Sequence, residues 1–352
     1  MSRRKHHRRS SGRRSSRRSR EQRRNIRLLK KAGLLLAIFA VGTAIAFAVE
    51  FLCEPEIEYA EEQLTVYESD EAQPSIFVGD QWYAQRNLET LLVIGVDDLG
   101  EITGADSYNN GSQADFLALL IRDLDTNQST ALHINRDTMT DVPILGVTGA
   151  QAGTRREQLA LAYYYGQGEE DSCENTVAAV SNLLYGAPID HYIAVTMDAV
   201  PIMNDWAGGV RLEILDDFTA INPDLIQGTE ALLLGEDALH YVKTRAGLSD
   251  STNLNRMERQ RQYASAWFEK AKPRFNDYQA LAELMDDVEP YYYSSCSLEQ
   301  LKDLASAFAD HPPEISHQLP GQAVTNQFME FHVDEPALQA LVLDLFYKPI
   351  AQ

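Results

Sequence analysis

Cysteine is scarce in this sequence, which contains three in 352 residues. A disulfide-dense scaffold is therefore excluded, and no Cys–His constellation indicates a cysteine nucleophile. Cys53 is interpreted as a free thiol at a membrane interface. Cys173 and Cys296 would be able to pair in an exported chain, and two buried unpaired thiols are an equal alternative.

Other signatures are missing as well. The C-terminal third has no Gly-rich phosphate loop, no HExxH and no CxxC. These absences exclude from it a nucleotide-binding loop, a zinc-protease helix and a thiol redox motif. The sequence also shows no internal repeat and no second core. A single domain over residues 87–350 is therefore predicted.

Basic residues are scarce everywhere except at the N-terminus. Residues 1–31 hold 15 Lys and Arg residues and one acidic residue, which predicts a basic, disordered cytoplasmic tail. The rest of the chain carries 16 basic against 51 acidic side chains, a formal charge of −35. The tail's charge alone would permit nucleic-acid binding, but no folded reader element accompanies it. No nucleic-acid partner is therefore expected.

A long uncharged run follows the tail. Residues 32–49 carry no charge, and a helix of this length spans about 27 Å, close to the hydrocarbon thickness of a bilayer. We predict a transmembrane helix over residues 32–52 that anchors the protein in the cell membrane as a type II protein. The positive-inside rule gives it a cytoplasmic N-terminus and an extracellular C-terminal domain. A removable signal peptide is the alternative, because residues 46–48 resemble a cleavage site. Residues 53–86 are predicted as a juxtamembrane spacer with a short strand near residues 76–78.

Strand-like and helix-like patterns alternate after residue 87. This alternation predicts an α/β fold, a single mixed α-β-α layered domain with a central sheet. Strands are expected over residues 91–95, 116–121, 131–134, 191–196 and 210–214. Helices are expected over residues 156–166, 172–185, 198–207, 229–242, 255–270, 278–288, 298–309 and 335–347. Ser172 is predicted as an N-cap.

Charged residues stand where the first three strands begin or end. Asp97 follows the first strand, Asp115 precedes the second, and Arg136 and Asp137 follow the third. If adjacent strands pair, these side chains share one edge of the sheet. Carboxylates bind hard cations, and arginine binds phosphate bidentately. The pattern therefore predicts a metal-assisted phosphate site.

A second basic group lies further along the chain. Arg245 precedes a loop, and Arg256, Arg259 and Gln260 follow it at spacings that share one face of a helix. Guanidiniums near a helix N-terminus oppose the macrodipole unless an anion lies nearby, which favours a phosphate or acidic partner. A solvated helix with Glu–Arg pairs is the alternative.

Several short motifs occur in a characteristic order. They are Gly95-Val96-Asp97, Ala114-Asp115-Phe116, Ile134-Asn135-Arg136-Asp137, Ile189-Asp190-His191-Tyr192, Gly208-Gly209-Val210, residues 235–245, Asn255-Arg256 and Arg259-Gln260. This order resembles the LytR-CpsA-Psr family of cell-wall glycopolymer ligases. The resemblance implies transfer of a glycopolymer from a polyprenyl-pyrophosphate carrier to peptidoglycan by phosphodiester formation, in a Gram-positive-type envelope.

The resemblance also implies roles for single residues. Asp97 and Asp115 would hold a divalent cation, Mg²⁺ in the first place, and Gln260 would orient the pyrophosphate. Asp137 would orient the guanidinium of Arg136. The clamp on the pyrophosphate oxygens would consist of Arg136, Arg245, Arg256 and Arg259. Such a transfer needs mainly alignment and charge neutralisation.

The sequence also departs from the family pattern. Leu99, Asn135 and Gln158 stand where the family usually has Arg, Pro and Lys. The prenyl tail would need an apolar tunnel, for which residues 231–234 are candidates. A non-catalytic binder of prenyl-pyrophosphate lipids and a membrane-bound regulator of envelope functions are the alternatives to the enzyme.

Overall fold

The computed structural model describes residues 66–67, 75–102, 104–105, 108–146, 148–244, 253–313 and 315–350. The chain divides at residue 64, and all described residues belong to the compact second unit, residues 64–352. Among them, no helix combines the length and the apolar character that a membrane crossing requires. The predicted tail and anchor, Cys53 and Arg245 lie outside the described residues.

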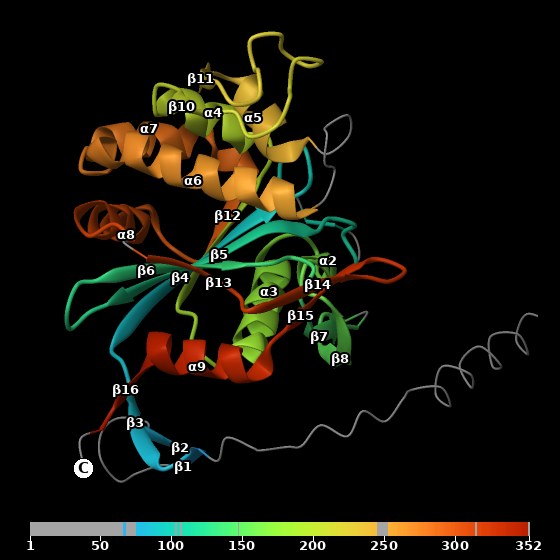
Figure 1. Cartoon of the computed structure of the whole chain (residues 1–352), viewed down its shortest axis with the longest axis vertical. Helices are drawn as coiled ribbons and strands as arrows, with labels where there is room; N and C mark the ends of the chain where they lie inside the picture. The colour runs from blue at the N-terminus through green and yellow to red at the C-terminus, as the bar shows by residue number, and fades with distance from the viewer. Residues whose placement is uncertain are drawn as a thin grey trace, which may run out of the picture. The chain divides into compact units, whose positions relative to one another are not determined.

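A mixed six-stranded sheet forms the centre of the second unit (Figure 1). Its spatial order is β12-β9-β4-β5-β6-β13. Strand β9 runs parallel to β4 and β13 runs parallel to β6, whereas the other neighbours are antiparallel. The strands are β4 (Leu88–Val96), β5 (Ala114–Asp123), β6 (Ser129–Ile134), β9 (His191–Thr196), β12 (Tyr292–Ser294) and β13 (Ile315–Gln318).

Both faces of this sheet are covered by helices. Successive side chains of a strand point to opposite faces, and here both faces are apolar and need to be buried. On β4, Leu92 and Ile94 pack with α3 (Glu170–Leu183) and α9 (Glu335–Phe346). Leu91 faces the other way and packs with α8 (Leu298–Asp310) and with Phe268 of α6 (Asn253–Phe275). Figure 1 shows α6 and α8 on one side of the sheet and α3 and α9 on the other. The predicted α-β-α layering is confirmed.

Smaller elements surround these layers. Three two-stranded sheets are β7 (Met139–Leu145) with β8 (Gln151–Gln158), β10 (Val210–Glu213) with β11 (Glu230–Leu233), and β14 (Gly321–Thr325) with β15 (Met329–Val333). The remaining helices are α2 (Leu161–Tyr164), α4 (Ala199–Trp206), α5 (Glu236–Lys243), α7 (Tyr278–Asp287) and the 3₁₀ turn η1 (Glu289–Tyr291). Helices α4, α6, α7 and α8 share one apolar cluster, and β10, β11, α5 and α6 share another.

Two predicted helices are wrong in part. Residues 156–166, predicted as a helix, contain the end of β8 and the single turn of α2. The first part of the predicted helix over residues 229–242 is strand β11. In both places the segment pairs with an antiparallel partner strand, β7 and β10 respectively. Tertiary pairing overrides local helix propensity there.

Ser172 is also not an N-cap. It lies inside α3, which begins at Glu170, and its hydroxyl accepts from the amide of Gly168 at 2.8 Å and from Nδ2 of Asn110 at 2.9 Å. The serine therefore organises the loop before the helix. Cys173 in the same helix is buried, and Cys296 is partly buried, and both are free thiols.

Ordered structure begins before the predicted domain start at residue 87. The expected short strand near residue 76 is confirmed as β2 (Ser75–Val78), which pairs with β1 (Val66–Tyr67) and β3 (Gln81–Gln85). Strand β3 also pairs with the C-terminal strand β16 (Tyr347–Pro349). The final part of the predicted spacer, residues 75–85, is therefore integrated into a sheet with the chain's last strand.

Candidate active site

Asp115 occupies a bulge in the central sheet. Gly95 lies opposite Phe116 and Val96 opposite Ala114, so Asp115 has no opposite residue in the ladder. A bulge re-aims a side chain at the end of a strand. Glycine is needed at position 95, because a Cβ there would lie 2.8 Å from the Cβ of Phe116. The Asp115 carboxylate is thereby turned into a buried position, with 4% of the residue exposed.

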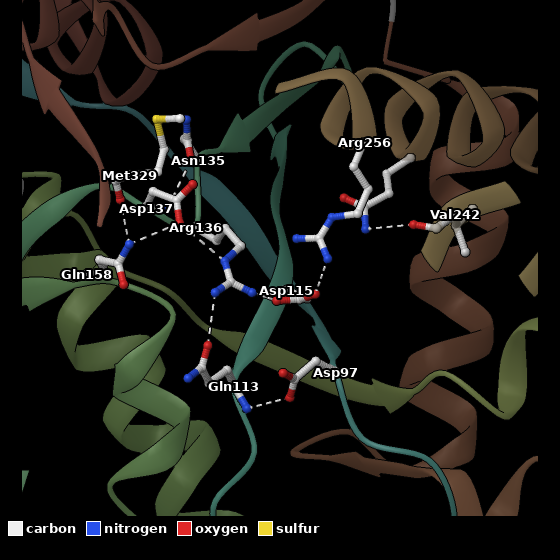
Figure 2. A network of polar contacts seen from close by, with 11 residues as sticks. Asp97, Gln113, Asp115, Asn135, Arg136, Asp137, Gln158, Val242, Arg256 and Met329 are labelled. Atoms are coloured by element: carbon white, nitrogen blue, oxygen red, sulfur yellow. Dashed lines mark hydrogen bonds and ion pairs between the residues drawn. The ribbon is translucent and has the colours of Figure 1, made fainter. Parts of the chain in front are cut away.

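Two arginines from distant parts of the chain meet at Asp115 (Figure 2). Nη1 of Arg136 contacts Oδ1 of this carboxylate, and Nη1 of Arg256 contacts Oδ2. Arg136 follows β6, whereas Arg256 lies near the start of α6. Both arginines are buried, at 9% and 2% exposed. Asp115 and Arg136 thus lie together, as expected from their places at strand ends, whereas the contact with Arg256 was not predicted; charge-assisted donors lie side by side here.

The turn that carries Arg136 is shaped by Asn135. Its side-chain oxygen accepts from the amide of Asp137 at 2.9 Å, and its carbonyl accepts from the hydroxyl of Thr138 at 2.6 Å. An asparagine that accepts from the backbone two residues on forms an Asx turn. Asn135 therefore gives this turn a defined shape without the proline that the resemblance leads one to expect.

The guanidinium of Arg136 has two further partners. Its Nε lies 3.3 Å from Oδ1 of Asp137, and its Nη2 donates to Oε1 of Gln113 at 2.9 Å. Nε2 of Gln158 donates to the same Asp137 oxygen at 3.1 Å and to the Met329 carbonyl at 2.6 Å. Figure 2 shows Gln113, just before β5, reaching Arg136, and Gln158 of β8 reaching Asp137 in the turn after β6. The predicted ion pair of Asp137 with Arg136 is present.

Asp97 lies on the other side of Gln113. The backbone amide of Gln113 donates to Oδ1 of Asp97 at 2.7 Å, and its side-chain oxygen accepts from Arg136. Gln113 therefore links Asp97 to Arg136. Asp97 is exposed, unlike Asp115. Among the residues that the structure describes, no group of three or more His, Cys, Asp or Glu side chains could hold a metal. Any cation at Asp97 and Asp115 would therefore need ligands from outside the protein, as Mg²⁺ at phosphate sites commonly has.

Arg259 lies in a cage of its own. Its Nε is 3.4 Å from Oδ2 of Asp216, and its Nη2 donates to the Thr244 carbonyl at 2.6 Å. The guanidinium also lies over the rings of Phe218 and Tyr241, with its carbon 5.1 Å and 5.9 Å from their centroids. Burial lowers the pKa of Arg259, and Asp216 opposes this shift. Arg259 holds the end of α5, and its predicted contact with phosphate stays a prediction.

An apolar cavity of about 400 Å³ lies between the central sheet and α6. Ala118 and Ala131 line it from the sheet, and Trp267 and Phe268 line it from α6. Phe116, the neighbour of Asp115, and Gln260, the neighbour of Arg259, also line it. Nε2 of Gln260 donates to the Val242 carbonyl at 3.3 Å. Of the predicted tunnel segment 231–234, residues 231–233 lie in strand β11, and none of the four residues lines this cavity.

His133 also lines this cavity, and its ring lies 5.2 Å from that of Phe116. Burial, together with the nearby Arg261, lowers the pKa of His133 to about 4, although Glu258 opposes this shift. The imidazole is therefore neutral near pH 7. Between pH 6.5 and about 4, the unfolded chain binds a proton that the folded chain does not, so the free energy of unfolding falls as the pH falls.

We expect the free energy of unfolding to drop by about 2–3 kcal/mol more in the wild-type chain than in His133→Gln between pH 7 and pH 4.5. Urea unfolding at the two pH values measures this difference. The exposed His311 provides the control, since His311→Gln should keep the wild-type pH dependence. Equal pH dependence in His133→Gln and the wild type would contradict the predicted neutral state of His133.

The structure brings together most of the predicted site and adds partners that the sequence analysis missed. Asp115, Arg136, Asp137 and Arg256 form one cluster, with Asp97 joined to it through Gln113. Gln113 was missed although it stands two residues before Asp115. Asp216, the partner of Arg259, carries no local signal, because it lies in an irregular segment after β10.

The layered sheet makes this an α/β protein. It has a buried arginine–aspartate cluster at one end of the sheet and an apolar cavity between the sheet and α6. A family model described as the LytR_cpsA_psr family matches residues 58–345. The chain belongs to this family.

Individual relatives agree with this assignment. A Halalkalibacterium halodurans protein named polyisoprenyl-teichoic acid–peptidoglycan teichoic acid transferase TagU is 26% identical over 209 residues, which are 59% of this chain and 64% of that protein. The match thus spans less than two thirds of that relative. A solved structure from Streptococcus agalactiae has a TM-score of 0.59 at 20% identity and covers 73% of this chain and 86% of its own. Bacillus subtilis TagU has a TM-score of 0.52 at 21% identity, with 74% and 96% covered. The solved structures share the fold.

Proposed function

We propose that this protein is a phosphotransferase that moves a glycopolymer from a polyprenyl-pyrophosphate carrier to peptidoglycan. The observation that carries the proposal is the apolar cavity lined by Phe116, the residue directly after Asp115, whose carboxylate holds buried Arg136 and Arg256. A ligand that fits both must join a hydrocarbon chain to a multiply charged anion, and a prenyl pyrophosphate does so. The cavity volume lies within the range typical of ligand sites. The name of the Halalkalibacterium halodurans relative supports the same substrate class.

Arg136 and Arg256 are the groups that would bind the pyrophosphate. Guanidiniums match phosphate oxygens bidentately and keep their charge when buried. In the transfer, a hydroxyl oxygen of peptidoglycan forms a bond to the phosphorus that carries the glycopolymer. The bond from this phosphorus to the prenyl phosphate oxygen breaks, the hydroxyl proton is released, and polyprenyl phosphate leaves. The arginines neutralise the charge on the leaving phosphate, which is the main requirement of such a transfer.

Asp97 and Asp115 would hold a Mg²⁺ ion with the help of the substrate. Hard carboxylate oxygens suit this ion, and Mg²⁺ usually binds through one or two carboxylates together with phosphates and water. Both oxygens of Asp115 contact arginines. Each carboxylate oxygen has a second lone pair, so Asp115 could hold the ion and the arginines together. When bound, the ion would add charge neutralisation to that of the guanidiniums.

The proposed place of the enzyme is the cell membrane. A single span over residues 32–52, with residues 1–31 in the cytoplasm, would hold the catalytic domain on the extracellular side, where lipid carrier and peptidoglycan meet. The charge pattern of the sequence supports this arrangement.

The test is to incubate the full chain with a polyprenyl-pyrophosphate-linked oligosaccharide and peptidoglycan, with Mg²⁺ or with EDTA, and to follow polyprenyl phosphate. We expect release that needs Mg²⁺ and that Ala118→Trp abolishes, because an indole at Ala118 would fill the cavity. Ala323→Trp, on the exposed hairpin β14–β15, should release as the wild type does. Lipid binding without release would contradict the transferase and leave a non-catalytic binder of the lipid.

A further inference from the structure

A second, polar groove lies on the α3 side of the sheet, whereas the apolar cavity lies on the α6 side. It runs between α3 and the strands β9 and β12, of which β12 is at the edge of the sheet. It is lined by Glu170, Glu174, Ser181, Asp190, Tyr192 and Tyr293 among others. Glu170 and Ser181 are eleven residues apart on α3, so the groove follows the helix for about 16 Å. A long, open polar groove of this kind suits a linear polymer better than a compact ligand.

Tyr192 gives this groove a buried polar group. The residue is only 8% exposed and lines the groove. Its backbone is held by Ser294 and Ser295, but within the described part of the chain its hydroxyl has no hydrogen-bond partner. The hydroxyl is thus open to a ligand in the groove, to which it can donate or from which it can accept a hydrogen bond. Burial and the nearby glutamates raise the pKa values of Tyr192 and Tyr293, so both hydroxyls remain protonated donors.

The carboxylates of the groove also favour a ligand that carries many hydrogen-bond donors. Glu170 and Glu174 are exposed and stand one helical turn apart, a spacing at which like charges repel. Neither has a basic partner among the described residues. The described residues also contain no group of three such ligands that could hold a metal. A ligand with many hydroxyl donors would satisfy these carboxylates without being a cation.

One end of the groove is joined to the candidate active site through the chain that follows Asp97. The amide of Ile102 donates to the Pro290 carbonyl at 2.8 Å, next to β12. The amide of Ala105 donates to the Gln167 carbonyl at 2.7 Å, just before α3. The segment that leaves the site therefore contacts the chain just before β12 and just before α3, near the end of the groove where Glu170 lies.

We infer that this groove binds the uncharged glycan strand of the acceptor and holds it along α3 beside the active site. Sugar hydroxyls donate to the glutamates and accept from the tyrosines, and a tyrosine ring offers an apolar face to a sugar ring. The acidic lining repels phosphate-rich polymers, so the groove separates acceptor from donor polymer. The identity of the acceptor rests on the proposed function, whereas binding of glycan to the groove does not.

The experiment measures binding of peptide-free peptidoglycan glycan strands to the full chain, without lipid donor, by calorimetry in a detergent that lacks a sugar headgroup. Tyr192→Phe removes one hydroxyl, and Glu174→Gln removes one charge and keeps the shape. Each should raise the Kd about tenfold, the effect of one lost hydrogen bond of this type. Tyr278→Phe and Glu283→Gln, on the exposed face of α7, are the matched controls and should bind as the wild type does.

Wild-type affinity in Tyr192→Phe and Glu174→Gln would overturn the inference, as would tighter binding of polylysine or of a poly(glycerol phosphate) than of glycan. Release of polyprenyl phosphate from the lipid donor in the presence of peptidoglycan separates this result from the proposed function. If the wild type releases none but binds glycan through Tyr192, the transferase proposal fails and the groove stands. If release is normal and both variants bind glycan unchanged, the groove inference alone fails.

Discussion

Asp115→Asn is expected to lower the free energy of unfolding by about 3–5 kcal/mol, because it leaves two buried guanidiniums without their carboxylate. Arg136 and Arg256 both contact Asp115, and all three residues are at most 9% exposed. The same substitution should abolish polyprenyl phosphate release, since the two arginines lose the group that holds them together. Urea unfolding and the release assay measure the two effects.

Asp97→Asn separates the structural effect from the chemical one. Asp97 is exposed and accepts one hydrogen bond, from the Gln113 amide, which an asparagine oxygen can also accept. Its substitution should therefore change the free energy of unfolding by less than about 1 kcal/mol, yet reduce Mg²⁺-dependent release. An Asp115→Asn protein as stable as Asp97→Asn would contradict the role of Asp115 as the shared partner of two buried arginines.

Arg136→Gln is expected to reduce the turnover number by about 10²–10³, the effect of removing one preorganised donor from a transition-state site. Arg136 contacts Asp115, Asp137 and Gln113, so its guanidinium is held in place before substrate arrives. Arg136→Lys should not restore activity, because an ammonium cannot reproduce the planar fork. Steady-state release of polyprenyl phosphate from the carrier lipid measures the loss.

Arg155→Gln is the matched control for this prediction. Arg155 lies on the exposed strand β8, where its side chain is 64% exposed and pairs with Glu157 at 2.8 Å. Its substitution should leave release within twofold of the wild type, since an exposed ion pair contributes only about 0–1 kcal/mol. Similar losses in Arg136→Gln and Arg155→Gln would show that general loss of charge, and not the held guanidinium, explains the effect.

Local patterns predicted the central part of the fold well. The apolar run of β4 and the alternation in β9 are signals that a few neighbouring residues carry, and both strands are found where they were expected. Segments whose structure depends on a partner strand were predicted less well. Residues 151–158 form β8 because β7 lies beside them, and β11 exists because β10 does. Local propensity cannot contain that information.

The site shows the same division. Charged residues at strand ends and the spacing on α6 were sufficient to select Asp115, Arg136, Asp137 and Arg256. The spacing also placed Arg259 on the same face, but the structure gives it Asp216 as a partner. The i, i+3 rule fixes where a side chain leaves the helix, and long arginine side chains then choose among partners that only the tertiary structure supplies.

The sequence by itself determined the alternation of strands and helices, the acidic character after residue 31, and the set of charged residues from which the site is built, because each depends on composition or on short-range periodicity. The tertiary structure decided which of these charges meet. Asp115 and Arg256 are 141 residues apart, and they meet because a bulge turns Asp115 toward the start of α6. The apolar cavity and the polar groove likewise exist only where distant elements pack, since their walls come from opposite layers around one sheet.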